Sequence, residues 1–429
     1  MATLSDKIVI VGAGCFGVSS AYHLLKRGFA DVTILDRSPI LPAPDAASND
    51  INRIVRSSYS DVFYANLARE AIVAWKNRSE WRDTYKESGV LVLGLTENEA
   101  YADKGYQNDI TLGATLTQVA DTAIRSAFPS KVPTATFGSK SGYLNKEGGW
   151  ADAGQGITIM IDTVVSLGCK VLPGKSVRHI TRNTGGKTNG VECEDGTFYE
   201  AATVIIASGS WTPSTFPDVT VGHTSGLSTG QCVAMIQLSE EEAEIYKDIP
   251  VVLDFETGFY IFPPTRKGIV KMAMHLAGYT HSNGGEISRP RTIIDDPIRG
   301  LAIPKYNVQQ LRTHLRMVYP ELAGKPFSAT RLCWYNDSPD GNWIIGRVPG
   351  DPSLILATAG SGHAYKFLPV IGRLVADTVD GTIDPEVAAK FSIERSYVAV
   401  DESRLEMAVA ELDLDQLCTL EDLQINSKT

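Results

Sequence analysis

The chain of 429 residues lacks the features that mark membrane-spanning, secreted and zinc-binding proteins. No apolar run reaches the roughly 18 residues that a spanning helix needs, and no basic and apolar leader precedes the first predicted strand. The six cysteines are scattered, without a CxxC pair or a Cys/His cluster, which argues against a disulfide framework and against a metal site. We therefore expect a soluble, intracellular protein in a reducing compartment.

Basic residues are also fewer than acidic ones, 40 against 50. The net charge is -10, which opposes sequence-independent binding to nucleic acid or to an anionic membrane and favours a small-molecule partner. The last residues, Ser427, Lys428 and Thr429, differ from the peroxisomal Ser-Lys-Leu signal in the final position, so we expect a cytoplasmic location.

Low-complexity tracts and repeats are absent, and 43% hydrophobic with 21% charged residues is ordinary for a globular protein. The length exceeds what one hydrophobic core usually supports. Two domains are expected, with a ligand site at their interface.

The N-terminal stretch KIVIVGAGCFGVSSAYHLLKRG predicts a buried strand over Ile8 to Val11, a tight turn and an amphipathic helix. Gly12 permits the turn, Gly14 lets the backbone approach a pyrophosphate, and Gly17 lets the helix pack closely on the strand. A second strand ends at Asp36, at the spacing of a carboxylate that binds ribose hydroxyls. This order predicts dinucleotide binding and leaves FAD and NAD(P) open.

Two later stretches, GTFYEAATVIIASGSWTP and DPSLILATAGSGHAYKFLPVIGRLVADTVDG, also read as strands followed by glycine turns. We therefore predict a nucleotide-binding domain assembled from segments 1–50, 145–220 and 325–385, and a substrate domain from 51–144 and 221–324. NAD dehydrogenases seldom have this layout. Acidic and apolar residues interleave in the tail, 386–429, and predict an amphipathic helix from Asp401 onward.

Three further motifs stand in a fixed order: SNDINRIVRSSYSD, GFYIFPPTRKGIVKMAMH, and ATRLCWYND followed by NWIIGR. With the N-terminal motif they resemble the monomeric sarcosine oxidase and amadoriase group of flavoprotein amine oxidases, which has the D-amino-acid-oxidase-like fold. Within this group, the sequence of the chain is similar to that of the fungal amadoriase and saccharopine-oxidase branch. The resemblance implies an α/β (α+β) fold, with a Rossmann-type FAD-binding domain and a substrate domain on a mixed, largely antiparallel sheet. It also implies a monomer.

The same resemblance implies a cofactor site with a covalent link. In the family a late cysteine is joined to the flavin through sulfur, and Cys333 occupies that place, although a free cysteine is more often a buried core residue. The other residues expected at FAD are Gly12, Gly14, Gly17, Asp36, Arg37, Arg53, Gly209 and Gly362.

The resemblance also assigns catalytic and substrate-binding residues. Lys271 takes the place of the family's lysine, whose ammonium stabilises the developing superoxide as O2 takes electrons. Tyr260 and His275 are expected in the substrate pocket. Arg56 and Lys366 would hold the substrate carboxylate, which an arginine can bind through two parallel hydrogen bonds.

Departures from the family pattern limit the substrate. Amadoriases carry arginine where this chain has His363, which we place with the substrate-binding residues, and an acid just after the position of Lys271, where this chain has Met272, Ala273 and Met274. A sugar would leave hydroxyl groups unpaired there, at about 1 to 3 kcal/mol each.

We therefore expect an FAD-dependent oxidase of a secondary α-amino acid, such as an N-methyl amino acid, pipecolate or saccharopine, that gives an imine and hydrogen peroxide. Aromatic residues near the inferred site suggest a side chain larger than that of sarcosine: Tyr59, Phe259, Tyr260, Trp334 and Tyr365. Three alternatives stay open: a fructosyl amino acid oxidase, a dehydrogenase or biosynthetic oxidase whose imine cyclises, and a flavoprotein without catalysis.

Overall fold

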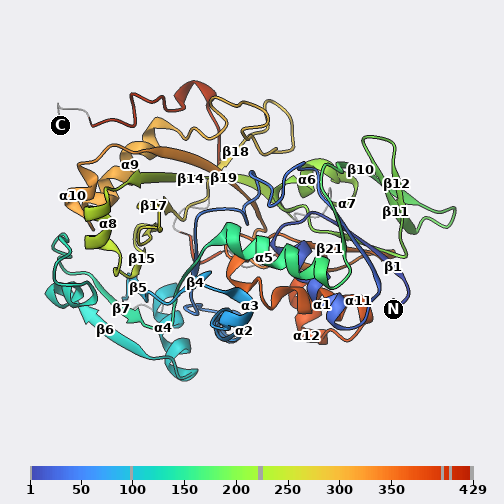
Figure 1. Cartoon of the computed structure of the whole chain (residues 1–429), viewed down its shortest axis with the longest axis horizontal. Coiled ribbons are helices and arrows are strands. Elements are labelled where there is room, and N and C mark those ends of the chain that lie inside the picture. The colour runs from blue at the N-terminus through green and yellow to red at the C-terminus, as the bar shows by residue number, and fades with distance from the viewer. Residues whose placement is uncertain (1, 97–99, 221–225, 398–400, 405–407, 426–429) are drawn as a thin grey trace.

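The computed structural model describes residues 2–96, 100–220, 226–397, 401–404 and 408–425 (Figure 1). The C-terminal tripeptide that we compared with a peroxisomal signal lies outside these residues. Within them, no helix has both the length and the apolar composition to cross a membrane, and no three His, Cys, Asp or Glu side chains gather as a metal site would require.

A six-stranded sheet confirms the predicted Rossmann-type α/β architecture. Its order is β20-β21-β13-β1-β2-β9, and every neighbouring pair is parallel except the edge pair of β20 and β21. The strands span Lys7–Val11 (β1), Asp31–Leu35 (β2), Lys170–Leu172 (β9), Thr203–Ile206 (β13), Ile344–Val348 (β20) and Asp351–Thr358 (β21). Strands from distant parts of the chain thus form one sheet, as the separated sequence motifs indicated.

Glycines bring the first helix close to this sheet. Helix α1, Cys15–Lys26, follows the turn at Gly12, whose φ is +109°. A Cβ at Gly12 would lie 2.5 Å from the carbonyl oxygen of Ala207, and a Cβ at Gly17 would lie 1.9 Å from that of Gly12. A side chain at either position would therefore push the helix or β13 away from β1.

A ten-stranded mixed sheet forms the second layer. Its order is β22-β18-β14-β17-β16-β15-β5-β7-β6, and β19 also pairs with β14. The strands span Val90–Leu93 (β5), Leu116–Ala120 (β6), Ser141–Asn145 (β7), Leu227–Gln237 (β14), Val251–Asp254 (β15), Phe259–Ile261 (β16), Ile269–Met274 (β17), Tyr279–Thr280 (β18), Ala329–Asp337 (β19) and Ala410–Glu411 (β22).

Two small sheets complete the strand structure. Strands β3 (Arg53–Val55) and β4 (Tyr85–Lys86) both pair with β8 (Gly149–Ala151). Strands β10 (Val177–Arg182), β11 (Thr188–Cys193) and β12 (Phe198–Glu200) project at one end of the molecule (Figure 1).

Besides α1, the α-helices span Val62–Trp75 (α2), Arg78–Trp81 (α3), Tyr101–Thr111 (α4), Ala153–Ser166 (α5), Thr212–Thr215 (α6), Pro217–Thr220 (α7), Glu240–Tyr246 (α8), Lys305–Arg316 (α9), Pro320–Ala323 (α10), Ile371–Asp380 (α11) and Pro385–Phe391 (α12). Helices α8, α9 and α10 lie at the end of the molecule opposite the projecting strands, whereas α1, α5 and α11 lie near β1 and β21 (Figure 1). Short 3-10 helices span Asp121–Ala127 (η1), Gly209–Trp211 (η2), Tyr365–Phe367 (η3) and Leu414–Gln416 (η4).

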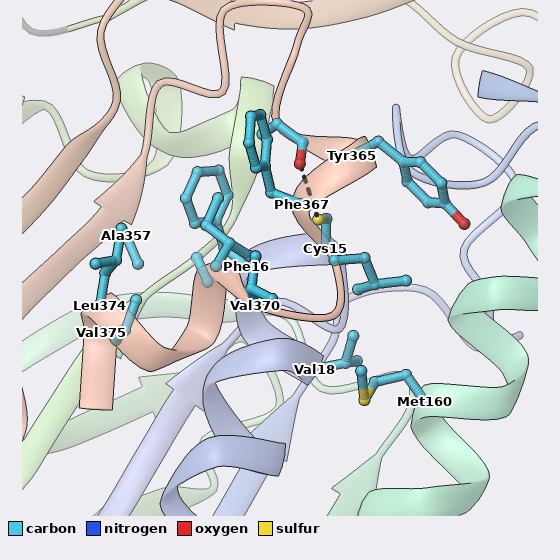
Figure 2. Packing of buried hydrophobic residues seen from close by; sticks show 14 of the residues in the cluster. Cys15, Phe16, Val18, Met160, Ala357, Tyr365, Phe367, Val370, Leu374 and Val375 are labelled. Atoms are coloured by element: carbon cyan, nitrogen blue, oxygen red, sulfur yellow. Dashed lines mark hydrogen bonds between the residues drawn. The ribbon is translucent and has the colours of Figure 1, made fainter. Parts of the chain in front are cut away.

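The hydrophobic core under the first sheet supports the turn that follows β21. Figure 2 shows Cys15 and Phe16, at the start of α1, close to Tyr365 and Phe367 of η3. The Sγ of Cys15 donates a hydrogen bond to the carbonyl oxygen of Ala364, 3.8 Å away. The beginning of α1 and the η3 turn are therefore held together.

The tail differs from the single amphipathic helix that we predicted from Asp401 onward. Its described residues, 401–404 and 408–425, contain β22 and η4 and no α-helix. The apolar side chains that they bury have irregular spacing and pack against the ten-stranded sheet: Leu412, Leu417, Cys418 and Leu423. The interleaved acidic and apolar residues of the tail resembled a helical pattern, but in the structure Ala410 and Glu411 form strand β22, which pairs with β18.

Candidate active site

Two adjoining cavities lie between the two large sheets. The larger cavity has a volume of about 450 Å³ and the smaller about 270 Å³. Both are lined by Arg53, Tyr335, Gly362 and Tyr365, so these residues form their common boundary. Gly362 has a φ of +72°, and a Cβ there would lie 2.6 Å from the ring of Tyr335, which explains the need for glycine at this boundary.

The larger cavity collects the residues predicted to bind a dinucleotide. Gly12, Gly14, Asp36, Arg37 and Gly209 all line it. The Gly14 N-cap of α1 provides no side-chain hydrogen bond, and no acidic residue stands in the first turn, which leaves backbone N–H groups available to an anion. These features fit a pyrophosphate at the helix N-terminus. Gly17 does not line the cavity and acts through packing of α1.

Asp36 and Arg37 stand at the edge of the larger cavity. The Asp36 carboxylate accepts hydrogen bonds from the backbone N–H groups of Ala13 (2.7 Å) and Ser38 (2.8 Å). Burial raises the pKa of Asp36, although these bonds oppose the shift. The Arg37 guanidinium lies over Trp211, 4.1 Å from the ring centroid. A carboxylate and a cation–aromatic pair here suit the nucleoside part of a dinucleotide.

The smaller cavity contains two buried cations, Arg56 and Lys366. Arg56 follows β3 and donates to the carbonyl oxygen of Ser58 and, at 3.5 Å, to the hydroxyl of Tyr101. Lys366, in η3, donates to the hydroxyl of Tyr59 (2.7 Å) and to a backbone carbonyl (2.9 Å). Within the part of the chain that the structure describes, neither cation forms an ion pair. Burial, and then the charge of Arg56, lower the pKa of Lys366 well below its ordinary value. The cavity is therefore suited to an anion.

His363 is linked to Lys366 through the hydroxyl of Tyr59. Because the carbonyl oxygen of Gly341 can only accept, Nε2–H of His363 donates to it (2.9 Å), and Nδ1 of the neutral ring accepts from the Tyr59 hydroxyl (3.1 Å). Burial lowers the pKa of His363 to about 3, so the ring is neutral. His363 lines the smaller cavity, but the protein already uses both of its ring nitrogens.

Lys271, on β17, is 1% exposed and lines the smaller cavity. Its Nζ donates to the Asp50 carboxylate (2.9 Å) and to the carbonyl oxygen of Asn52 (2.6 Å). Asp50 also pairs with Arg53 and, at 3.9 Å, with Arg331. Burial lowers the pKa of Lys271 to about 7, against the opposing effect of Asp50. The side chain is thus a cation held in place that can lose its proton near neutral pH.

Cys333, on β19, is 1% exposed, and the next residues along the strand line the cavities, Trp334 the larger and Tyr335 both. Its Sγ accepts a hydrogen bond from Nη2 of Arg53 at 3.3 Å. It packs with Val233, Ala273 and the partly buried Tyr260. Cys333 is not itself a lining residue of either cavity, whereas Arg53 lines both.

The remaining predicted pocket residues are only partly brought together. Tyr260 and His275 line the smaller cavity, as do Tyr59 and Tyr365. Trp334 instead lines the larger cavity. Phe259 lies outside both cavities, because it points into the core of the second sheet and stacks on the ring of His314.

Sequence reasoning missed several residues at this site. Asp50 stands three residues before Arg53 in the same motif, and that spacing was the signal available. Tyr335 stands in the ATRLCWYND motif, two residues after Cys333, whereas Tyr101 and residues 401–403 of the tail line the smaller cavity without a recognisable motif.

Known proteins match this chain in sequence and in structure over most of its length. The family model described as "FAD dependent oxidoreductase" matches residues 7–378. L-saccharopine oxidase of Schizosaccharomyces pombe is 31% identical over 403 residues, which cover 89% of this chain and 92% of that protein. Human peroxisomal sarcosine oxidase is 23% identical, over 86% of this chain and 90% of that protein. The crystal structure of fructosyl amine:oxygen oxidoreductase (Amadoriase I) from Aspergillus fumigatus has a TM-score of 0.85 and 26% identity, and covers 98% of this chain and 99% of that one.

Proposed function

The chain belongs to the FAD dependent oxidoreductase family, and on that premise we propose that it oxidises the C–N bond of a secondary α-amino acid, giving an imine and hydrogen peroxide. Relatives named for saccharopine, sarcosine and fructosyl amines support amine oxidation as the reaction class. The observation that carries the proposal is the buried pair Arg56 and Lys366, which lacks an anion partner in the described chain and lines the smaller cavity, beside the larger one.

A substrate carboxylate would complete this pair. Arg56 can donate two parallel hydrogen bonds to a carboxylate, and Lys366 supplies a compact second charge. Since the pKa of Lys366 is lowered, the arriving carboxylate would favour the charged form, and the lysine would take up a proton as the substrate binds. The carboxylate would thereby fix the neighbouring C–N bond.

The larger cavity is the proposed FAD site, with the glycine turn and α1 at the pyrophosphate and Asp36 at a ribose. FAD, when bound, accepts two electrons from the substrate and passes them to O2. Lys271 would place a positive charge in the wall of the smaller cavity, linked through Asp50 to the boundary residue Arg53, and there it can stabilise negative charge that develops on O2. Asp50 and the carbonyl of Asn52 hold that ammonium in position.

N-methyl amino acids, pipecolate and saccharopine remain the candidate substrates. Fructosyl amino acids fit less well, because Met272, Ala273 and Met274 are all buried apolar residues where amadoriases carry an acid. The proposal also takes the enzyme to act as a monomer in the cytoplasm, on the basis of the sequence resemblance and of the scattered cysteines, which suit a reducing compartment.

The proposed reaction predicts a specific product pattern. Incubating the purified protein with each candidate should give hydrogen peroxide and the carbonyl compound or cyclic imine, in equal amounts, for at least one secondary α-amino acid. Peroxide is measured by a coupled peroxidase assay and the organic product by mass spectrometry. Product without peroxide would indicate a dehydrogenase instead, and turnover of fructosyl glycine alone would favour the sugar-amine alternative.

We further propose that Cys333 Sγ is covalently attached to FAD. The thiol is oriented by its contact with Arg53, which lines the larger cavity. After denaturation and acid precipitation, the flavin colour should stay in the pellet of the wild type and move to the supernatant for Cys333→Ala. Cys232→Ala is a matched control, because that buried cysteine lies on the neighbouring β14 and should leave the colour in the pellet. Release of flavin from the wild type would contradict the attachment.

A further inference from the structure

A short piece of the C-terminal tail, residues 401–404, forms part of the wall of the smaller cavity. Asp401, Glu402 and Ser403 line it together with His275, which follows β17. Ser403 Oγ lies 2.9 Å from Nε2 of His275, although 128 residues separate the two along the chain. The tail therefore reaches the proposed substrate site.

A buried ion pair fixes this piece of the tail to the body of the protein. Arg404 donates from both terminal nitrogens to the two carboxylate oxygens of Asp337, at 2.9 and 2.7 Å. The side chains are 6% and 10% exposed, and Asp337 also accepts a hydrogen bond from Thr229. Arg404 pairs in addition with Asp401 at 3.1 Å. A bidentate pair with so little exposure holds the neighbouring Ser403 at a defined distance from His275.

The direction of the hydrogen bonds determines the tautomer of His275. Ser403 has one hydroxyl proton, which it donates to the Asp401 carboxylate at 2.5 Å. Its oxygen can then only accept from His275, so Nε2 carries the proton of the ring. Within the described residues, Nδ1 has no hydrogen-bond partner. Burial, together with the charges of Arg404, Arg56 and Lys366, lowers the pKa of His275 well below its ordinary value, so the ring is neutral and Nδ1 has a free lone pair.

We propose that Ser403 and Asp401 are positioning residues that hold His275 as the Nε2–H tautomer, so that the lone pair of Nδ1 accepts a hydrogen bond from the N–H group of the substrate amine. This inference rests on the proposed function, because it assumes that a secondary amino acid occupies the smaller cavity. The substrate ammonium must lose one proton to solvent before the C–N bond is oxidised, and the N–H group that remains on the secondary amine then donates to Nδ1. His275 stays neutral throughout, because burial and the charges of Arg404, Arg56 and Lys366 hold its pKa well below its ordinary value. The ring therefore orients the amine and does not take up its proton.

The donors and acceptors of the smaller cavity support this role of Nδ1. Arg56 and Lys366 bind the carboxylate end of the substrate and can only donate, so the ammonium needs an acceptor elsewhere in the cavity. The unprotonated nitrogen of a neutral imidazole offers a lone pair to an N–H donor and is such an acceptor.

The tautomer can be observed without any enzymatic turnover. In protein labelled with ¹⁵N-histidine, long-range ¹H–¹⁵N correlation spectra should show His275 protonated at Nε2 and unprotonated at Nδ1, with the signals assigned by their loss in His275→Gln. In Ser403→Ala the Nε2 preference should weaken. A wild-type ring protonated at Nδ1 would overturn the inference, whether or not the proposed oxidation is found.

The kinetic test compares Ser403→Ala with Ser403→Thr, which keeps the hydroxyl. With a substrate identified by the peroxide screen, Ser403→Ala should lower kcat by about 10- to 100-fold, up to the roughly 10²-fold that misplacement of the reacting groups by about 1 Å can cost. KM should change little, because Arg56 and Lys366 still bind the carboxylate, and Ser403→Thr should restore most of kcat. Equal kcat in Ser403→Ala and the wild type would overturn the inference while leaving the oxidase function intact. Absence of peroxide from every candidate would instead count against the proposed function.

Discussion

Replacing Lys271 with methionine should slow the reoxidation of the reduced enzyme by O2 about 10²- to 10³-fold, while reduction by substrate changes far less. The side chain places a buried, oriented ammonium in the wall of the smaller cavity, where O2 would take up electrons. Removing one such preorganised group from a buried site typically costs this much. Stopped-flow measurements of the two half-reactions separate the effects.

The fold of Lys271→Met should survive, because Asp50 keeps Arg53 and Arg331 as partners. Lys140→Met is a suitable control, since Lys140 also forms ion pairs, with Asp254 and Glu256, but lies outside both cavities. Proportional loss in both half-reactions would remove the role assigned to Lys271.

The pKa of Lys271 predicts that the rate of reoxidation by O2 depends on pH. Burial lowers the pKa of Lys271 to about 7, so the ammonium is present below that pH and is lost as the pH rises through it. The reoxidation rate should therefore fall with increasing pH. Negative charge gained nearby would raise the pKa and move the fall above pH 7. In Lys271→Met this pH dependence should vanish.

Replacing Arg56 with methionine should lower kcat/KM for the free amino acid by a factor of about 30 to several thousand. Truncating one partner of a buried, hydrogen-bonded charge pair costs about 2 to 5 kcal/mol, and about 1.4 kcal/mol corresponds to a factor of ten. Arg56→Lys should lose less, because it keeps the charge and loses only the paired geometry of the guanidinium.

The methyl ester of the substrate provides the matching test. The wild type should prefer the free acid strongly, whereas Arg56→Met should handle acid and ester more equally, as judged by kcat/KM from peroxide release. Equal turnover of acid and ester by the wild type would contradict the role of Arg56 and Lys366.

The nucleotide-binding half of the fold could be predicted because its signals are local. The strand, the turn at Gly12, the helix and Asp36 follow one another within one stretch, and each residue type has a steric or hydrogen-bonding reason to be there. Lys271, Arg56 and Lys366 were predicted by resemblance alone, and the structure places all three around one cavity.

The support of these residues could not be predicted, because it comes from contacts between distant segments. Asp50 matters because Arg53, Lys271 and Arg331 converge on it from three parts of the chain. Likewise, no periodic pattern relates Ser403 to His275, and the acidic and apolar residues of the tail suggested a helix instead.

The position of residues 401–404 also bears on how the protein is made. Translation proceeds from the N-terminus, and domains generally fold in that order. The residues that line the larger cavity end at Tyr365, so all of them leave the ribosome before Asp401 and Ser403 do. A nascent chain can therefore form the proposed FAD cavity before residues 401–403 are available, and these residues then complete the wall of the proposed substrate cavity.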